Sequence, residues 1–358
     1  MRKDEKSLKV VDFFCGAGGM SYGLQTAGLK ILAGIDCDVA CEQTYRSNIK
    51  DALFLKEDIS KYNPDSLADI LSINANDDHL VFAGCSPCQF YSRIRTNKEK
   101  SQKTAFLLMH FQRFIEHFRP GFVVVENVPG LFTKKEGSAL PGFTAFLRSL
   151  DYEYADDIVN TVDFGVPQHR KRYLLIATRL TNDVSLPPKI KDPRLIIMNF
   201  IGEKHGFQKI LAGHRDTNIR RCHTAAKLSP NNLKRIQKTS KDGGTRADWK
   251  DDPILQIEAY AGRDEIFRDV YGRMQWNKPS PTITTRFISL SNGRFGHPEE
   301  DRAISVREGA TLQSFPKSFV FKSSNLNSLA RQIGNAVPPE LARRIGLHLK
   351  EIVGHAKV

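Results

Sequence analysis

Two cysteines separated by two residues follow a short apolar run, in the sequence GCSPCQ at 84–89. A Cys-x-x-Cys pair can be a thioredoxin-like redox couple or half of a zinc site, whereas a single cysteine can act as a nucleophile. The histidines are scattered along the chain, which disfavours zinc, and a sheet of nucleotide-binding type precedes the pair, which disfavours a redox couple. The sequence therefore favours a nucleophilic Cys88, whose thiolate would be stabilised by nearby cations and backbone donors.

A carboxylate and a group of basic residues accompany two further apolar runs. Glu126, in the sequence ENVP, follows the run 122–125. A buried carboxylate is costly there unless it is used or paired, and it suits a group that must hold and donate a proton. The sequence QHRKR at 168–172 leads directly into the run 173–177, and strand alternation would point Arg170 and Arg172 the same way. A solvated start of a strand and a functional arginine pair are both compatible with these residues.

A glycine-rich turn, CGAGG at 15–19, follows the first apolar run. Glycines let the backbone approach a ligand closely as the chain turns into a helix. Asp36 follows the second run, 20 residues after Gly16, near the place where nucleotide-binding sheets put an acid for the ribose hydroxyls. The Gly-x-Gly-Gly spacing disfavours a pyrophosphate and favours S-adenosylmethionine. Asp58, after a short third strand, could accept a hydrogen bond from an adenine amino group.

These residues stand at the ends of expected strands, which alternate with helix-length segments. Strands are expected at 8–14, 30–35, 80–83, 122–125 and 173–177. The clearest helix is expected over 105–118, where Phe106, Met109 and other apolar residues recur near helical spacing and should pack in the core. The alternation predicts an α/β fold with a doubly wound, Rossmann-like, mostly parallel sheet, whose strands present ligand sites at their carboxyl ends.

Charge is concentrated in one part of this 358-residue chain, which is long enough for two lobes. The net charge is +13, and the segment 186–294 alone carries 21 Lys and Arg against 11 Asp and Glu. A proline-rich stretch, SLPPKIKDPR at 185–194, suits a linker before this segment. We therefore expect a nucleic-acid-facing module after the linker.

The composition also excludes several classes of protein. No apolar run approaches the roughly 18 residues of a membrane span, and the charged N-terminus lacks the apolar core of a signal peptide. Six cysteines in a chain of this length do not make a disulfide framework. An intracellular protein with reduced thiols is the expectation.

The ordered motifs resemble the cytosine-C5 DNA methyltransferases of bacterial restriction-modification systems. DFFCGAGG, SPCQ, ENV, QHRKR, REGATLQSFP and GNAVPP occur in the family's order between residues 10 and 340. The resemblance implies a catalytic, cofactor-binding domain at 1–185, completed by 328–358 with a helix from Pro339, and a smaller target-recognition domain at 186–327. Ser86 replaces the usual Pro, Cys85 stands where Gly is common, and Cys15 and Gly309 stand where Ala is frequent. None of these departures removes a reacting group.

The resemblance also implies a role for each motif residue. Cys88 would add to cytosine C6, Glu126 would contact N3 and the exocyclic amine, and Arg170 and Arg172 would hold the cytosine O2, the catalytic loop and nearby phosphates. Asn127 and Gln168 would contact the substrate, Arg307 would brace the smaller lobe, and no metal is expected. The residues expected to line S-adenosylmethionine are Phe14, Gly16, Ala17, Gly18, Gly19, Asp36, Asp58, Ile59, Pro87 and Asn335.

The expected partners follow from this reading. They are double-stranded DNA and a cognate restriction endonuclease, for a monomeric, cytoplasmic protein of a prokaryote that does not contact a membrane. A tRNA cytosine-C5 methyltransferase, a catalytically silent DNA-binding regulator and a nicotinamide-dependent oxidoreductase remain as alternatives. Trp249 and Trp276 are expected in the core. The candidates for contacts with guanine edges or phosphates are Arg220, Arg221, Arg246, Arg273 and Arg286.

Overall fold

The computed structural model describes residues 7–86, 106–133, 138–260 and 267–355, and the chain forms two compact units. Unit 1 comprises Met1–Phe164, Lys171–Ile190 and Ala336–Val358, and unit 2 comprises Gly165–Arg170 and Lys191–Asn335. The first boundary falls inside the expected linker at 185–194. The second differs from the expected boundary at 328, because the helix before residue 336 packs within unit 2.

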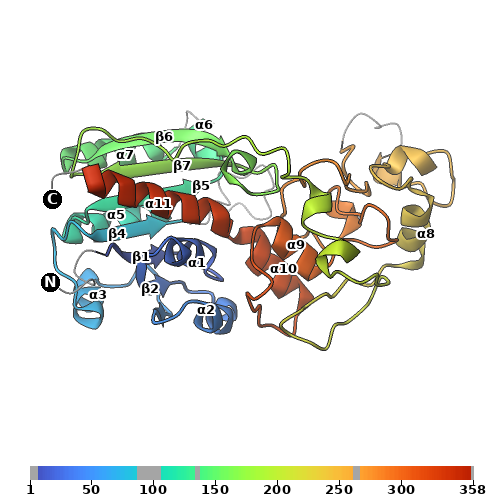
Figure 1. Cartoon of the computed structure of the whole chain (residues 1–358), viewed down its shortest axis with the longest axis horizontal. Coiled ribbons are helices and arrows are strands. Elements are labelled where there is room, and N and C mark those ends of the chain that lie inside the picture. The colour runs from blue at the N-terminus through green and yellow to red at the C-terminus, as the bar shows by residue number, and fades with distance from the viewer. Residues whose placement is uncertain (1–6, 87–105, 134–137, 261–266, 356–358) are drawn as a thin grey trace. The chain divides into compact units, whose positions relative to one another are not determined.

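Unit 1 contains a seven-stranded sheet with the strand order β3-β2-β1-β4-β5-β7-β6 (Figure 1). The first five of these strands are mutually parallel, whereas β7 runs antiparallel to both of its neighbours. The predicted α/β, Rossmann-like fold is thus confirmed, with one edge of the sheet antiparallel. The strands are β1 Lys9–Phe13, β2 Lys30–Ile35, β3 Leu53–Leu55, β4 Leu80–Gly84, β5 Phe122–Asn127, β6 Glu153–Asn160 and β7 Lys171–Thr178.

Helices cover both faces of this sheet, as a doubly wound fold requires (Figure 1). Apolar residues of α3, α5 and α7 share one core with the sheet, and α1 packs against α11 on the other face. The expected C-terminal helix from Pro339 is confirmed and belongs to unit 1. The helices of unit 1 are α1 Gly19–Thr26, α2 Glu42–Asn48, α3 Pro64–Leu71, α5 Leu107–Phe118, α6 Gly130–Thr133, α7 Leu140–Ser149 and α11 Pro339–His355, with 3₁₀ turns at Val39–Cys41 and Thr161–Phe164.

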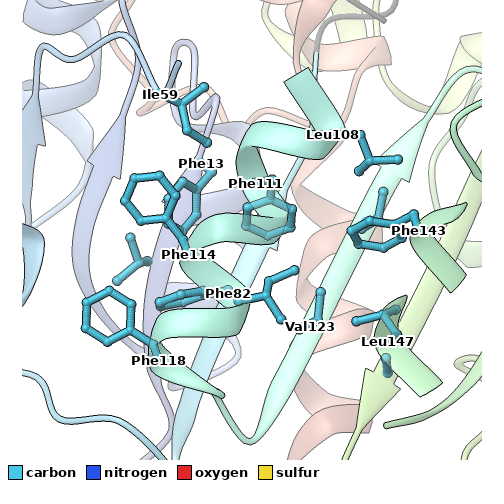
Figure 2. Packing of buried hydrophobic residues seen from close by; sticks show 14 of the residues in the cluster. Phe13, Ile59, Phe82, Leu108, Phe111, Phe114, Phe118, Val123, Phe143 and Leu147 are labelled. Carbon is cyan, nitrogen blue, oxygen red and sulfur yellow. The ribbon is translucent and has the colours of Figure 1, made fainter. Parts of the chain in front are cut away.

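An aromatic cluster fixes α5 on the sheet (Figure 2). The ring of Phe13, at the end of β1, lies 4.9 Å from that of Phe111 and 5.1 Å from that of Phe114 between centroids. Such tilted and edge-on aromatic pairs add to the free energy gained by burial. The predicted helix is present, but Phe106 and Met109 are exposed rather than in the core, because they lie on its solvent side.

Unit 2 has little regular structure and is held by buried polar residues as well as by apolar ones. Its small core includes Trp249, as expected, whereas Trp276 is half-buried. The Arg273 side chain is fully buried, and it donates to the backbone carbonyls of Ile236, Thr239 and His297. The helices are α8 Pro230–Lys238, α9 Val306–Leu312 and α10 Leu326–Asn335, with 3₁₀ turns at Ile197–Asn199, Glu203–His205, Arg246–Trp249, Glu258–Tyr260 and Leu290–Asn292.

Candidate active site

The glycine-rich turn after β1 has a backbone that demands glycine. Gly18 has a φ of 93°, and a Cβ atom there would lie 3.0 Å from the Tyr45 ring. Gly16 has a φ of 52°, but a Cβ atom there would meet nothing within 4 Å. Phe14 also has a positive φ, of 61°, which is uncommon outside glycine and is often found at functional sites. The turn is therefore tightly packed at Gly18 and open beside Gly16.

Asp36, which lies 20 residues after Gly16, is hydrogen-bonded to this turn. Its Oδ2 accepts a hydrogen bond of 2.8 Å from the backbone N–H of Gly16, and its Oδ1 accepts one of 2.8 Å from Asp38. The contact arises because β1 and β2 are adjacent parallel strands, so their carboxyl ends meet. Burial raises the pKa of Asp36, while the two backbone donors oppose that shift.

The other residues expected to line the cofactor have different surroundings. Asp58 is exposed, and its Oδ1 accepts hydrogen bonds from the hydroxyl and backbone N–H of Ser60, which lower its pKa. Ile59 is buried in the aromatic core (Figure 2), and Ala17 is buried in the turn. Asn335 is exposed at the end of α10 in unit 2. Pro87 lies outside the described residues.

A buried acid also supports this turn, although its residue type and position predicted no functional role for it. Asp12 on β1 is fully buried, and its Oδ2 accepts hydrogen bonds from the backbone N–H and hydroxyl of Ser21 on α1. The Ser21 hydroxyl lies 3.0 Å from that of Tyr45, whose ring contacts Gly18. The signal for this network was present in the strand KVVDF, because an acid in an apolar strand must be paired.

Asp12 predicts a specific pH dependence of stability. Burial raises its pKa from 3.8 to about 7, although the hydrogen bonds from Ser21 oppose the shift. The unfolded chain therefore releases this proton near pH 4, whereas the folded protein keeps it to about pH 7. As the pH rises from about 4 to about 7, the free energy of unfolding should fall by at most about 1.4 kcal/mol per pH unit. Above about pH 7, the contribution of Asp12 should no longer change with pH.

Asp12→Asn keeps a neutral group in this position and removes the titration. The melting temperature of the variant relative to wild type should rise as the pH increases from about 5 to about 8. Thermal melts across this range measure the difference. A constant difference between the two proteins would show that Asp12 does not hold a proton in the folded state.

Glu126 and Arg172 form a buried ion pair across adjacent strands. Glu126 on β5 pairs in register with Leu174 on β7, so Arg172, two residues before Leu174, lies on the same face. The Arg172 Nε lies 3.1 Å from Glu126 Oε1, and both side chains are less than 15% exposed, at 14% and 9%. Burial lowers the pKa of Arg172, and the Glu126 carboxylate opposes that shift. The guanidinium therefore holds one oxygen of a carboxylate that has little access to water.

Asn127 connects this pair to the segment that leads to Cys88. Its amide donates to the hydroxyl of Ser86 at 3.1 Å and to the Ser86 carbonyl at 3.3 Å, and all of these groups are buried. Cys88 itself lies outside the described residues. Burial and the carboxylates of Glu126 and Asp12 raise the pKa of Cys85 well above its ordinary value. Cys85 is therefore a poor nucleophile at neutral pH.

Gln168 and Arg170 belong to unit 2, whereas Arg172 belongs to unit 1. Gln168 is buried, and its Oε1 accepts a hydrogen bond from the backbone N–H of Ile283 at 2.9 Å. Arg170 is buried and donates to the carbonyls of Ile283 at 2.9 Å and Gly334 at 3.0 Å. These hydrogen bonds of Gln168 and Arg170 thus hold residues of unit 2 to one another.

The arginines that the sequence offered as DNA contacts differ in exposure. Arg246 and Arg273 are buried, and the Arg246 guanidinium lies over the Tyr260 ring, so neither presents its charge to a ligand. Arg220, Arg221 and Arg286 are exposed, and Arg221 pairs with Asp216 at 3.2 Å. Arg307 is buried and donates to the carbonyls of Arg220, Arg221 and Phe319, which agrees with the bracing role expected of it.

Among the described residues, one cluster has the composition of a metal site: His297, Glu300 and Glu308 in unit 2. Arg302 already donates to both oxygens of each carboxylate, over distances of 2.7 to 3.0 Å. Burial opposes ionisation of Glu308, but Arg302 holds its pKa well below the usual range. The arginine supplies the positive charge that a cation would bring, so this cluster is a structural ion-pair network.

The fold and the site define a class of protein. The sheet, with a glycine-rich turn after β1 and an acid after β2, has the Rossmann-like architecture of methyltransferases. One similar solved structure is a protein encoded within a prophage of E. coli and named as a DNA modification methyltransferase. Its TM-score is 0.74 at 23% identity, and the alignment covers 98% of this chain and 100% of that one. Spodoptera frugiperda DNMT2 gives a TM-score of 0.63 at 16% identity over 98% of this chain and 100% of that one.

The chain belongs to the C-5 cytosine-specific DNA methylase family, whose model matches residues 8–351. It is 36% identical to the Type II methylase M.HgiDII of Herpetosiphon aurantiacus, over 96% of this chain and 95% of the relative. It is 32% identical to the Type II methyltransferase M1.HphI of Haemophilus parahaemolyticus, over 95% of this chain and 86% of the relative. The protein is thus a DNA (cytosine-5-)-methyltransferase of the bacterial restriction-modification type, with DNA as its substrate and a methyl donor as its co-substrate. In the part of the chain that the structure describes, no helix is long and apolar enough to cross a membrane.

Proposed function

We propose that this enzyme transfers a methyl group from S-adenosylmethionine to carbon 5 of cytosine in one duplex DNA sequence, through a covalent adduct with Cys88 and with the target base flipped out. The observation that carries the proposal is the buried Glu126–Arg172 pair at the end of β5. Asn127, the next residue, is hydrogen-bonded to Ser86, two residues before Cys88. The carboxylate at the end of β5 is thereby linked to Ser86 after β4, and the candidate nucleophile follows Ser86 by two residues in the sequence.

The chemistry explains why both groups are needed. Cytosine C5 is a poor nucleophile. Addition of the Cys88 thiolate to C6, with a proton delivered to N3 at Glu126, converts the ring into an enamine that is nucleophilic at C5. After C5 is methylated, N3 returns its proton to Glu126, and a base such as water takes the C5 proton. The electrons of the C5–H bond form the C5=C6 double bond as the S–C6 bond breaks, which releases Cys88 as a thiolate. Covalent catalysis thus divides the reaction into easier steps, and the acid offsets the developing charge.

The turn after β1 suits the proposed cofactor. The open space beside Gly16 lets a ligand approach the backbone, and Asp36 presents carboxylate oxygens that can also accept hydrogen bonds from ribose hydroxyls. Asp58 is exposed at the next strand end, where it can accept from an adenine amino group. When bound, S-adenosylmethionine supplies the electrophilic methyl group. The residues that would hold it are therefore Phe14, Gly16, Gly18, Asp36 and Asp58.

Flipping is required because C5 and C6 are stacked inside the duplex, and it costs a few kcal/mol. We assign unit 2 to target recognition, because the segment 186–294 carries the excess of positive charge. Phosphate contacts from this segment would hold the duplex, and contacts with base edges would select the sequence.

Conversion-based sequencing of genomic DNA from a methylation-free bacterial host expressing the chain tests this proposal. We expect 5-methylcytosine at one short motif. A parallel tritium-transfer assay on duplex DNA and on tRNA distinguishes the two nucleic acids, and transfer to tRNA alone would overturn the DNA assignment. Failure of purified protein to bind S-adenosylmethionine would overturn the cofactor.

The similarity to Type II methylases supports a biological partner as well. We propose that a restriction endonuclease cleaving the same sequence accompanies this enzyme in a bacterial cytoplasm, and that the enzyme acts as a monomer. DNA methylated by the chain should resist one restriction specificity, and mass photometry should give a particle near the 40.4 kDa chain mass.

A further inference from the structure

The turn 282–287 of unit 2 is held by contacts on both of its halves, although Arg286 within it is exposed. Gln168 Oε1 accepts from the backbone N–H of Ile283, while Arg170 donates to the Ile283 carbonyl. The Thr282 hydroxyl donates to the His169 carbonyl at 2.8 Å. The segment 168–170 therefore holds the first half of this turn by side-chain and backbone contacts together.

Two glycines allow neighbouring elements to pack closely against the second half of the turn. A Cβ atom at Gly334 would lie 2.4 Å from the backbone of Thr284 and Thr285, so only glycine fits there. A Cβ atom at Gly309 would lie 2.3 Å from the buried ring of Phe287. The close packing of Phe287 therefore requires glycine at position 309.

Arg286 is carried by this braced backbone and is exposed. Its own N–H donates to the Thr284 hydroxyl at 3.3 Å, and its carbonyl accepts from the backbone N–H of Ser289 at 3.0 Å. The neighbouring Ile283 and Phe287 side chains are fully buried. The backbone on both sides of Arg286 is therefore fixed, while its guanidinium is presented to solvent.

We propose that Arg286 is a specificity-determining residue that reads a guanine edge in the target sequence. This inference rests on the assignment of unit 2 to target recognition. The rigid fork of arginine matches the O6 and N7 acceptors of guanine, and such bidentate readout requires a support held within a fraction of an ångström. A phosphate contact does not require such a support, because a flexible side chain can follow a phosphate.

The test compares methyl transfer to duplexes that each change one base pair of the wild-type motif, which the sequencing experiment above defines. Wild-type methylation of one motif tests the proposed function, and the variants then test Arg286 alone. With Arg286→Ala and Arg286→Lys we expect discrimination for G·C at one position to fall about 10- to 100-fold in kcat/KM. Preferences at the other positions should be retained.

Arg286→Lys is the matched control for charge, and Lys317→Ala removes an exposed basic side chain of unit 2 that lies outside the segment 186–294. Lys317→Ala should leave the methylated motif unchanged. A uniform loss of activity on all duplexes, rescued by Arg286→Lys and with a weaker salt dependence, would make Arg286 a phosphate contact and overturn the inference. An unchanged profile for both Arg286 variants would overturn it as well.

Discussion

Cys88→Ala should lose methyl transfer by a factor on the order of 10⁴ or more, the scale seen when a covalent nucleophile is removed. Without thiolate addition at C6, C5 remains unreactive however well the duplex and the methyl donor are bound. Cofactor affinity and DNA affinity should be close to those of wild type, because neither depends on the S–C6 bond. Tritium transfer to duplex DNA measures the loss, and calorimetry measures the two affinities.

Cys85→Ala is the matched control, since it removes a thiol three residues away. The raised pKa of the Cys85 thiol makes it unreactive in the wild type, so the Cys85→Ala variant should keep most of the activity. A duplex carrying 5-fluorocytosine gives a second measurement, because the C5 proton that must leave is absent. Wild type and Cys85→Ala should form an adduct with it that survives denaturation, and Cys88→Ala should form none. Normal methylation by Cys88→Ala would overturn the covalent mechanism.

Glu126→Gln should reduce kcat by about 10²- to 10⁴-fold, the usual contribution of a positioned acid or base. Glutamine keeps the size of the side chain and can still accept from Arg172, but it cannot hold the proton that N3 needs. S-adenosylmethionine binding should be retained, because Glu126 lies at the end of β5 and the glycine-rich turn follows β1. Single-turnover kinetics with calorimetry of the cofactor measure both quantities.

The change at Glu126 also removes a charge from a buried ion pair, so stability must be measured beside activity. Leaving a buried charge without its partner costs about 3–5 kcal/mol, and the partial exposure of Arg172 reduces that cost. Arg172→Lys is the informative companion: it keeps the charge beside Glu126 but loses the planar fork. A folded Glu126→Gln protein with unchanged turnover would remove the proposed role of this carboxyl group.

The sequence by itself determined the parallel part of the fold and the glycine-rich turn after β1. Apolar runs separated by helix-length segments predicted β1, β2, β4 and β5, since strands buried on both faces read as continuous apolar runs. The meeting of Asp36 with Gly16 was predictable as well, because adjacent parallel strands bring their carboxyl ends together. The edge strand β6 was not predicted, since its residues are half exposed and include several acids.

Tertiary structure alone decided how the remaining functional residues are grouped. The antiparallel insertion of β7 beside β5 pairs Arg172 with Glu126, which are far apart in the chain. Arg170, two residues before Arg172, donates to the carbonyls of Ile283 and Gly334. A local motif specifies which groups are present, but long-range strand pairing and burial determine their partners. Burial likewise decided that Arg273 is a core residue, whereas the need to pair Asp12 could already be read from its apolar strand.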